Sequence, residues 1–571
     1  MGEQEAATGS ILIVVPARAG SKGIPHKNVR ILDGKPLVAH ALATALGVPG
    51  AIVVLTTDDA EAADIARQYG VHVVDRPEGL CGDDVTLDPV VAHAWRSAEA
   101  AFGRAFHVIA TLQPTAPLLR SSTLIRAVEC VQSGRLDSCV TVTDARHLYW
   151  QGQVEAAIPL YETRVNRQWL PPLWRETGGA IVTRGEILAT GERLGGRVGI
   201  IPVDAAESVD IDSIDDWAVV ERRLGAPRVL YRVRGNKKIG LGHAYRCIGL
   251  ARRLFVPELL VAVDSDSDPA AELIRNEHFP VARVSGDDDF IEVVSRSEYD
   301  LIINDVLDTS SDYVEALKGH GRRVVVNFED VGTGAAAADL TVNALYEFST
   351  PAPNGRFGWR YADLRDEFLT TPPRVPGAPG RYVLITFGGS DPAGLTARAI
   401  RACARAAEAL GLCDLVVVLG PANEAAGEVH DVIEERRTVF GSVVVHTEVR
   451  RMSSLMRDAT FAITSNGRTV FELGALGIPM ITISQNRRET HHVFGRVSGG
   501  ALDLGLAAAL DDAEFQAAVL SLLREPARRA QMTRQLLQYD LRAGMERVVV
   551  EMLDCYGEWR RARRAKKGDR P

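Results

Sequence analysis

The chain alternates short apolar runs with alanine-rich helical stretches along most of its length. Residues 52–55 are apolar and precede a helical stretch at 60–69, and the apolar run 108–112 precedes another at 122–132. This alternation is typical of βαβ units, which build a mainly parallel sheet covered by helices. Because 571 residues are too many for one hydrophobic core, we expect an α/β protein of roughly three lobes.

The first apolar run leads into a glycine-rich loop that carries several cations. Residues 11–15 are apolar, and the loop after them holds two glycines and three basic side chains, at Arg18, Gly20, Lys22, Gly23 and Lys27. Glycine lets the backbone approach a polyanion, and the cations neutralise its charge. The loop therefore predicts a phosphate site, although its spacing is not the GxxxxGKS or GxxxxGKT pattern of P-loop NTPases.

A second glycine-rich turn follows the apolar run 229–233. It contains Gly240, Gly242 and His243, and a helix is expected to begin at about Ala244. Histidine titrates near neutral pH, so His243 is a candidate base for activating water. The simpler alternative is a histidine that caps the helix or packs against it.

A third turn, Gly388-Gly389-Ser390, lies between the apolar run 382–387 and an alanine-rich helix. Its backbone amides are placed to face a diphosphate at a helix N-terminus. Glu472, on the helix after Gly467, is a carboxylate able to accept hydrogen bonds from both hydroxyls of a ribose. The alternative for Asp391 is that it simply begins the helix.

Two acids, Asp210 and Asp212, alternate with the apolar Val209 and Ile211. On a strand, both carboxylates would point to one face and could share a hard cation such as Mg²⁺. The alternative is a solvated strand face, because further acids follow at Asp215.

Composition narrows the class of protein. A net charge of −9 and a pI of 5.9 give no basic field, so nucleic acid is not expected as the main partner. The seven cysteines show no metal-ligand spacing or disulfide framework. Neither a signal-like N-terminus nor a long apolar run occurs, so we expect a cytoplasmic protein without membrane insertion. The basic residues 560–567 predict either a solvated terminus or a contact with an anionic surface.

Proline- and glycine-rich breaks at residues 224–227 and 371–380 suggest domain boundaries. We therefore predict three domains: residues 1–225, residues 226–375, and residues 376–571 with the basic tail.

The first 225 residues resemble the CMP-sialic acid synthetase family of cytidylyltransferases. Beyond the phosphate loop, matches follow in order at Asp58, at the LQPTAP segment 112–117 and at the Asp-Ile-Asp segment 210–212. The resemblance implies a Rossmann-like nucleotidyltransferase domain that transfers CMP from CTP to a nine-carbon α-keto acid sugar, a nonulosonic acid, with release of pyrophosphate. It also implies a homodimer formed through this domain.

The same resemblance implies a role for each matched residue. Arg18 and Lys27 would be catalytic, and Asp210 with Asp212 would hold Mg²⁺. Arg167 and Gln168 would contact the acceptor sugar. The nucleotide would be bound by Arg18, Ser21, Lys22, Gly23, Lys27, Asn28, Asp58 and Gln113. The acceptor region departs from the family at Thr177-Gly178, where Asn-Gly is usual, and at Val182, where an aromatic residue is usual, so ordinary sialic acid specificity is not expected.

Residues 229 to about 510 resemble the UDP-sugar hydrolase of the pseudaminic acid pathway, an inverting, metal-independent enzyme with the two-lobed GT-B fold. The likeness rests on GLGHxxR at 240–246, Asp305 at a strand end, a YxLLRxEF-like segment at 361–368, and the loops 387–392 and 465–472. It implies that His243 and Asp305 are catalytic and that Tyr361 contacts the substrate. The nucleotide would be bound by Gly388, Gly389, Ser390, Asn466, Gly467 and Glu472. The family's proline-led Asn-Gln loop is replaced here by Ser484 to Glu489.

Together these observations predict a bifunctional enzyme of nonulosonic acid biosynthesis that makes a CMP-sugar and hydrolyses a UDP-amino-sugar. Two alternatives remain for the second half: an acceptor-dependent glycosyltransferase, or a nucleotide-sugar-binding module without chemistry.

Overall fold

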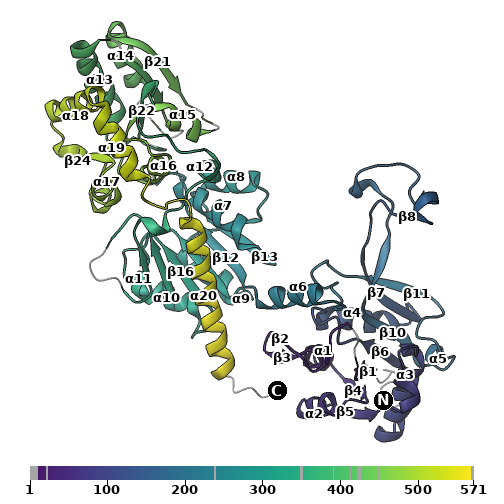
Figure 1. Ribbon diagram of the computed structural model, residues 1–571. Coiled ribbons are helices and arrows are strands. Elements are labelled where there is room, and N and C mark those ends of the chain that lie inside the picture. The colour runs from purple at the N-terminus through teal and green to yellow at the C-terminus, as the bar shows by residue number, and fades with distance from the viewer. Residues whose placement is uncertain are drawn as a thin grey trace. The chain divides into compact units, whose positions relative to one another are not determined.

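The computed structural model describes residues 11–20, 23–236, 239–347, 352–389, 391–411, 413–420, 423, 426–447, 449 and 451–566. The chain forms two compact units, of which the first ends at Ala226 and the second spans Pro227–Lys566 (Figure 1). No helix among the described residues is long and apolar enough to cross a bilayer.

The first unit is built on a seven-stranded sheet in the order β11-β7-β10-β6-β1-β4-β5. Every pairing is parallel except those of β10 with β6 and β7. The strands are β1 (Ile11–Pro16), β4 (Ala51–Thr57), β5 (His72–Asp75), β6 (Val108–Leu112), β7 (Ser138–Asp144), β10 (Trp174–Arg184) and β11 (Val198–Pro202). The helices are α1 (Leu37–Leu46), α2 (Ala60–Gln68), α3 (Leu87–Phe102), α4 (Ser121–Gln132), α5 (Gly185–Leu188) and α6 (Ile214–Gly225).

Strand β1 is buried along its whole length because helices cover both faces of the sheet. Ile13 and Val15 pack in one core with α1, α2 and α4, whereas Leu12 and Val14 pack in a second core with α3. A strand in this position needs a continuous apolar run, which is what the sequence supplies.

The second unit contains two lobes, each with an all-parallel sheet. The first lobe has the order β14-β13-β12-β15-β16-β17-β18, with β12 (Arg228–Val233), β13 (Glu258–Asp264), β14 (Val281–Val284), β15 (Leu301–Asp305), β16 (Val324–Phe328), β17 (Leu340–Asn343) and β18 (Gly355–Phe357). Its helices are α7 (Gly242–Leu254), α8 (Asp268–Asn276), α9 (Asp287–Arg296), α10 (Ser311–Lys318) and α11 (Gly334–Ala337).

The second lobe has the order β21-β20-β19-β22-β23-β24, with β19 (Tyr382–Thr386), β20 (Cys413–Val418), β21 (Phe440–His446), β22 (Ala459–Ser465), β23 (Met480–Ser484) and β24 (Ala501–Leu506). The helix α12 (Asp366–Thr370) precedes this lobe. The helices of the second lobe are α13 (Leu395–Leu410), α14 (Ala426–Arg436), α15 (Met452–Asp458), α16 (Thr469–Leu476), α17 (Phe494–Val497), α18 (Asp512–Arg524) and α19 (Pro526–Leu536). The α/β class and the GT-B-like pair of lobes are thus confirmed.

The last helix, α20 (Gly544–Lys566), packs in the first lobe and not in the domain 376–571 predicted from the sequence. Met545, Val548, Met552 and Tyr556 recur every three or four residues, so they form one apolar stripe that joins the core of β12 and α7. Residues 560–566 of the predicted basic tail continue this helix, whereas Lys567 lies outside the described residues. Just before them, Trp559 Nε1 donates to Gly321 O at 3.0 Å.

Candidate functional sites

In the first unit, the glycine-rich loop leaves the carboxyl end of β1 and is held there by its neighbours. Ala19 N donates to Asp58 Oδ1 at 2.8 Å, and Asp58 directly follows β4, the strand beside β1. The buried Asn28 donates from Nδ2 to Arg18 O at 3.0 Å. The carboxyl edge of a parallel sheet is where such folds bind ligands. Two predicted residues of this loop, Ser21 and Lys22, lie outside the described residues.

Arg18 is oriented by Gly82 and Asp83, two residues for which the sequence predicted no role. Its Nη2 lies 2.7 Å from Asp83 Oδ1, and its Nη1 donates to Gly82 O at 3.1 Å. The side chain is one-third exposed, so its position is fixed while the guanidinium stays accessible to a ligand. The short acidic run at Asp83-Asp84, next to a glycine, is the sequence signal that could have revealed this contact.

Lys27 joins the loop to the Asp-Ile-Asp segment. Its Nζ donates to Ile211 O at 2.7 Å and lies 3.7 Å from Asp212 Oδ1. Gly23 also approaches this segment, because a Cβ on Gly23 would lie 2.6 Å from Asp212 O. Tertiary structure therefore brings the predicted phosphate loop and the predicted metal residues together.

Asp210 and Asp212 do not alternate on a strand, contrary to the prediction. They lie in the loop before α6, because Ile211 N donates to Thr115 O instead of entering a sheet. Asp212 is largely exposed. Asp210 Oδ1 is buried and has no hydrogen-bond partner among the described residues, and burial raises the pKa of its carboxyl group although a hydrogen bond with Thr115 opposes this.

The residues predicted for the acceptor sugar lie on an arm. Arg167 and Gln168 form part of the short turn η3 (Arg167–Trp169), are exposed, and belong to the excursion of residues 145–173 that Figure 1 shows extending from β7 and β10. Arg146, which is bonded to Asp144, also donates to Gln168 O at 3.4 Å. Gln113 follows β6 at the sheet edge, where its backbone N donates to Gly179 O at 3.1 Å.

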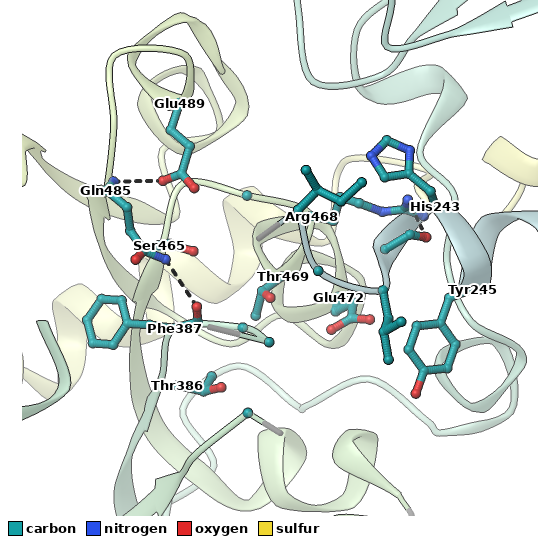
Figure 2. Close-up of a pocket in the computed structure, with 18 of the residues that line it drawn as sticks. His243, Tyr245, Thr386, Phe387, Ser465, Arg468, Thr469, Glu472, Gln485 and Glu489 are labelled. Atoms are coloured by element: carbon teal, nitrogen blue, oxygen red, sulfur yellow. Dashed lines mark hydrogen bonds between the residues drawn. The ribbon is translucent and has the colours of Figure 1, made fainter. Parts of the chain in front are cut away.

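In the second unit, a pocket of about 660 Å³ opens between the two lobes (Figure 2). The wall formed by the first lobe includes Gly240, in the turn before α7, and Gly242 and His243, the first two residues of α7. The second lobe contributes the turns after β19, β22 and β23. All of these segments follow carboxyl ends of strands, as expected for a nucleotide-binding cleft.

His243 is held by Asp305, the last residue of β15. His243 Nδ1 makes a hydrogen bond with Asp305 Oδ1, and Asp305 also accepts from Arg246 Nε at 2.8 Å and from Tyr231 OH at 3.0 Å. Burial opposes ionisation of Asp305, but the charges of Arg246 and His243 lower its pKa well below the usual range. In the tautomer that carries the proton on Nδ1, the ionised carboxylate accepts this proton and Nε2 is the nitrogen with the free lone pair. Arg246 Nη2 lies 3.0 Å from the same Nδ1. The structure therefore brings the two predicted catalytic residues together.

Arg246 extends this buried cluster to Glu329. Its Nη1 donates to Glu329 Oε1 at 2.6 Å. Burial tends to raise the pKa of the Glu329 carboxyl group, but the positive charges around it, above all that of Arg246, lower this pKa to about 2. Neither Arg246 nor Glu329 was singled out as a site residue from the sequence, although Arg246 belongs to the GLGHxxR pattern.

Tyr361, predicted to contact the substrate, lies elsewhere. It ends the turn η4 (Trp359–Tyr361), lines a different cavity, and donates from its hydroxyl to Glu551 Oε1 on α20 at 3.4 Å. The reason is that η4 packs against α20, a contact no local pattern could reveal. From the same segment, Asp363 and Arg365 line the cleft instead.

On the nucleotide side, Gly388, Gly389, Gly467 and Glu472 all line the cleft, whereas Ser390 lies outside the described residues. Glu472 Oε1 accepts from Arg365 Nε at 2.9 Å. Asn466 is buried behind the cleft, with Oδ1 unpartnered among the described residues.

The N-terminus of α13 is not a free anion site. Asp391 accepts from the backbone N of Leu395 at 2.9 Å and of Thr396 at 2.7 Å, so its carboxylate occupies the first two amides of the helix, which begins four residues later at Leu395. The amides expected to face a diphosphate are therefore those of the glycine turn alone, and not those of the helix.

A glycine-rich, cationic loop at the carboxyl edge of a mainly parallel sheet defines a nucleotidyltransferase-type α/β domain, and a GT-B-like pair of lobes follows it in the chain. The family described as Cytidylyltransferase matches residues 12–155. CMP-N,N'-diacetyllegionaminic acid synthase of Legionella pneumophila is 31% identical over 228 residues, which make up 37% of this chain and 95% of that protein. The chain belongs to the cytidylyltransferase family.

Two further similarities cover other shares of the chain. An uncharacterized protein of Methanocaldococcus jannaschii is 26% identical over 270 residues, 44% of this chain and 54% of that protein, so the chain spans about half the length of that relative. The structure of MurG of Acinetobacter baumannii is 14% identical with a TM-score of 0.42, over 57% of this chain and 98% of that one. A score this low carries no argument about function.

Proposed function

We propose that the first unit transfers CMP from CTP to a nonulosonic acid and releases pyrophosphate. The observation that carries the proposal is the meeting of the phosphate loop with the Asp-Ile-Asp segment through Lys27. The names of similar proteins, which include CMP-N,N'-diacetyllegionaminic acid synthase and pseudaminic acid cytidylyltransferase, support this class of acceptor. CTP and UDP-sugars are metabolites of the cytoplasm, so we propose the same location for the protein.

In this proposal, Arg18 and Lys27 neutralise the triphosphate while an acceptor hydroxyl attacks the α-phosphate and pyrophosphate leaves. Charge neutralisation and positioning supply most of such catalysis. The backbone at Gly23 allows the polyanion to approach, and Asn28 and Gln113 would fix the nucleoside.

We include Mg²⁺ as the cofactor. No group of three or more metal-binding side chains occurs among the described residues, but Asp210 presents a buried carboxylate oxygen without a partner, and Asp212 lies beside it in the chain. This pair fits a hard cation that takes its remaining ligands from water and phosphates. Bound there, the ion would supply additional positive charge to the triphosphate.

We further propose that the first unit forms a homodimer. Its arm exposes large apolar side chains, including Trp150, Val154, Ile158 and Trp169, of which Val154 is 93% exposed. Large apolar side chains exposed along one segment favour an interaction surface. Light scattering in solution tests the proposal, and a monomeric mass at micromolar concentration would contradict it.

For the second unit, we propose hydrolysis of a UDP-amino-sugar. The supporting observation is the pair formed by His243 and Asp305 at the cleft. His243 Nε2 would take a proton from water while the water oxygen bonds to the anomeric carbon and the bond from that carbon to the diphosphate oxygen breaks. The products are UDP, the free sugar and a proton.

The first test is incubation with CTP, Mg²⁺ and a panel of nonulosonic acids, with pyrophosphate and the CMP-sugar as readouts. The D212A variant is expected to lose CMP transfer by roughly 100-fold or more while UDP release persists. The matched control is D215A, since Asp215 is an exposed acid in the first turn of α6, and it should retain both activities. Loss of both activities in D212A would contradict two independent sites.

The second test separates the three possibilities for the second unit. UDP release from a UDP-sugar without any acceptor, abolished in H243A, supports the hydrolase. Release that requires an acceptor indicates a glycosyltransferase instead. Binding of UDP without turnover in the unaltered protein favours the binding-module alternative. Turnover that is unchanged in H243A would overturn the catalytic role of the histidine.

A further inference from the structure

Arg468 reaches from the second lobe into the first at the centre of the cleft. It directly precedes α16, and its Nη1 donates to Gly242 O, in the first turn of α7, at 2.7 Å. The two segments approach closely, because a Cβ on Gly242 would lie 3.3 Å from Arg468 Cδ. Figure 2 shows Arg468 beside His243, on the side of the pocket that also holds Thr469 and Glu472.

The acidic partner of Arg468 is Asp363. The two side chains form an ion pair, and Arg246 Nη1 lies 3.4 Å from the same carboxylate oxygen. Asp363 is 3% exposed at the side chain, yet neither carboxylate oxygen has a hydrogen bond within the described part of the chain. In the YxLLRxEF-like segment, Asp363 stands where the pattern has its first leucine. Asp363 is therefore a buried acidic residue of the cleft wall at a position where the pattern has an apolar residue.

The other arginines that line the pocket are held by hydrogen-bonded acceptors. Arg365 donates to Glu472, and Arg488 donates to Asp308 and to Glu329 O. Arg468 donates to a backbone carbonyl and shares its one paired carboxylate, Asp363, with Arg246. Burial and the charge of Arg246 lower the pKa of Arg468 to about 10. An additional anion would therefore stabilise it.

Three glycine turns surround this guanidinium and leave backbone open toward the cleft. They contain Gly240 and Gly242, Gly388 and Gly389, and Gly467. The turns of the two lobes approach closely, since a Cβ on Gly389 would lie 3.8 Å from Gly240 Cα. The N-termini of α7 and α16, which carry partial positive charge, both lie at Arg468.

We propose that Arg468 binds the diphosphate of the nucleotide-sugar, and that Asp363 holds the guanidinium in place when the cleft is empty. This inference rests on the proposed binding of a UDP-sugar by the second unit. With Arg468 beside His243, the diphosphate lies next to the bond that breaks, so the charge that develops on the leaving UDP is neutralised by a side chain. Arg468 is then a catalytic residue that was not assigned from the sequence.

The test compares UDP with uridine, because only UDP carries the phosphates. Calorimetric titration of the full chain should give tighter binding of UDP than of uridine. The R468Q variant should weaken UDP binding by about 10- to 100-fold, the value of a charge-assisted contact, and change uridine binding by less than about twofold. R468K should retain part of the preference for UDP.

Two further variants exclude a purely structural effect. D363N/R468Q removes both charges, so no carboxylate is left buried without a partner, and it should lose the preference for UDP as R468Q does. R488Q removes another arginine of the cleft that pairs across the lobes, with Asp308, and it should change the affinities for UDP and uridine by the same factor.

Equal losses for UDP and uridine in R468Q and in the double variant would overturn the assignment of Arg468 while leaving the UDP site intact. If the unaltered protein binds neither ligand, the proposed function of the second unit fails, and this inference fails with it. Retained preference for UDP in D363N/R468Q would also overturn it.

Discussion

Single glycines decide where the acids of the first site can lie. Gly178 has φ of 67°, and a Cβ there would lie 2.3 Å from Asp210 Oδ2. Gly23 likewise makes room for the backbone of Asp212. The two acidic residues can therefore lie where they do only because Gly23 and Gly178 have no side chains. This explains why Gly178 of the family's Asn-Gly pattern is present although Thr177 replaces the asparagine.

At this scale we predict that G178A abolishes CMP transfer without unfolding the protein. The added methyl group displaces Asp210, and the positive φ costs about 1–2 kcal/mol in folding stability. Steady-state pyrophosphate release and chemical denaturation are the measurements.

The matched control is G70A, because Gly70 has φ of 71° and a Cβ there meets nothing within 4 Å. G70A should lose a similar amount of stability and keep its activity. Equal activity in the two variants would show that Gly178 does not position Asp210.

Among the elements, α20 ties the C-terminal end of the chain back to the first lobe of the second unit. Met552 is fully buried in that core, and Tyr556 OH donates to Asp300 Oδ2 at 2.7 Å. Glu551 of the same helix accepts hydrogen bonds from Arg356 and Tyr361, which is why Tyr361 does not line the cleft. The helix is thus part of the lobe that presents His243, and its packing supports that wall of the cleft.

We predict that M552A lowers the free energy of unfolding by about 2–5 kcal/mol, the cost of a cavity in a packed core. The control on the same helix is V550A, since Val550 is 56% exposed, and its effect should stay within about 0.5 kcal/mol. Denaturant titration followed by circular dichroism distinguishes the two. A result for M552A as small as that for V550A would mean that α20 does not belong to this core.

At the scale of the whole molecule, the two units differ in how deeply the charged side chains of their sites are buried. The first site holds its cations near the surface, where ligands reach them, as with the one-third exposed Arg18. The second unit buries a cluster of Arg246, Asp305 and Glu329 beside its cleft. Such a cluster costs desolvation and is stable only while each member keeps its charge.

This cluster predicts loss of stability in acid. The pKa of Glu329 falls from the ordinary value of 4.5 to about 2, and that of Asp305 is also lowered. A lowered pKa stabilises the folded state above the ordinary value, and this contribution is lost as the pH falls toward the folded value. The free energy of unfolding of the second unit should therefore decrease between pH 4.5 and about 2.

Denaturation of the full chain at a series of pH values measures this slope, and E329Q should make it shallower because one of the two shifted carboxyl groups is gone. An unchanged slope in E329Q would mean that the acid sensitivity arises elsewhere.

Local sequence was sufficient for much of both sites. Local patterns predicted the alternation of strands and helices, the phosphate loop with Arg18 and Lys27, and His243 as a candidate base, whereas the roles of Asp58 and Asp305 were implied by the resemblance to known families. Each depends on short patterns: apolar runs end at turns, and in parallel sheets those turns meet at one edge. The sequence by itself therefore determined the class of fold and the chemistry of the loops.

Only tertiary structure decided which of these residues act together. Asp210 lies in a loop and not on the predicted strand, because the backbone N of its neighbour Ile211 donates a hydrogen bond to Thr115 O. Tyr361 lies outside the cleft because it packs against α20. Asp363 pairs with Arg468 because the two lobes of the second unit pack against each other. Contacts between distant segments depend on how whole faces pack, which no local period encodes. The physical reason is that burial, unlike helix or strand propensity, is a property of the assembled core.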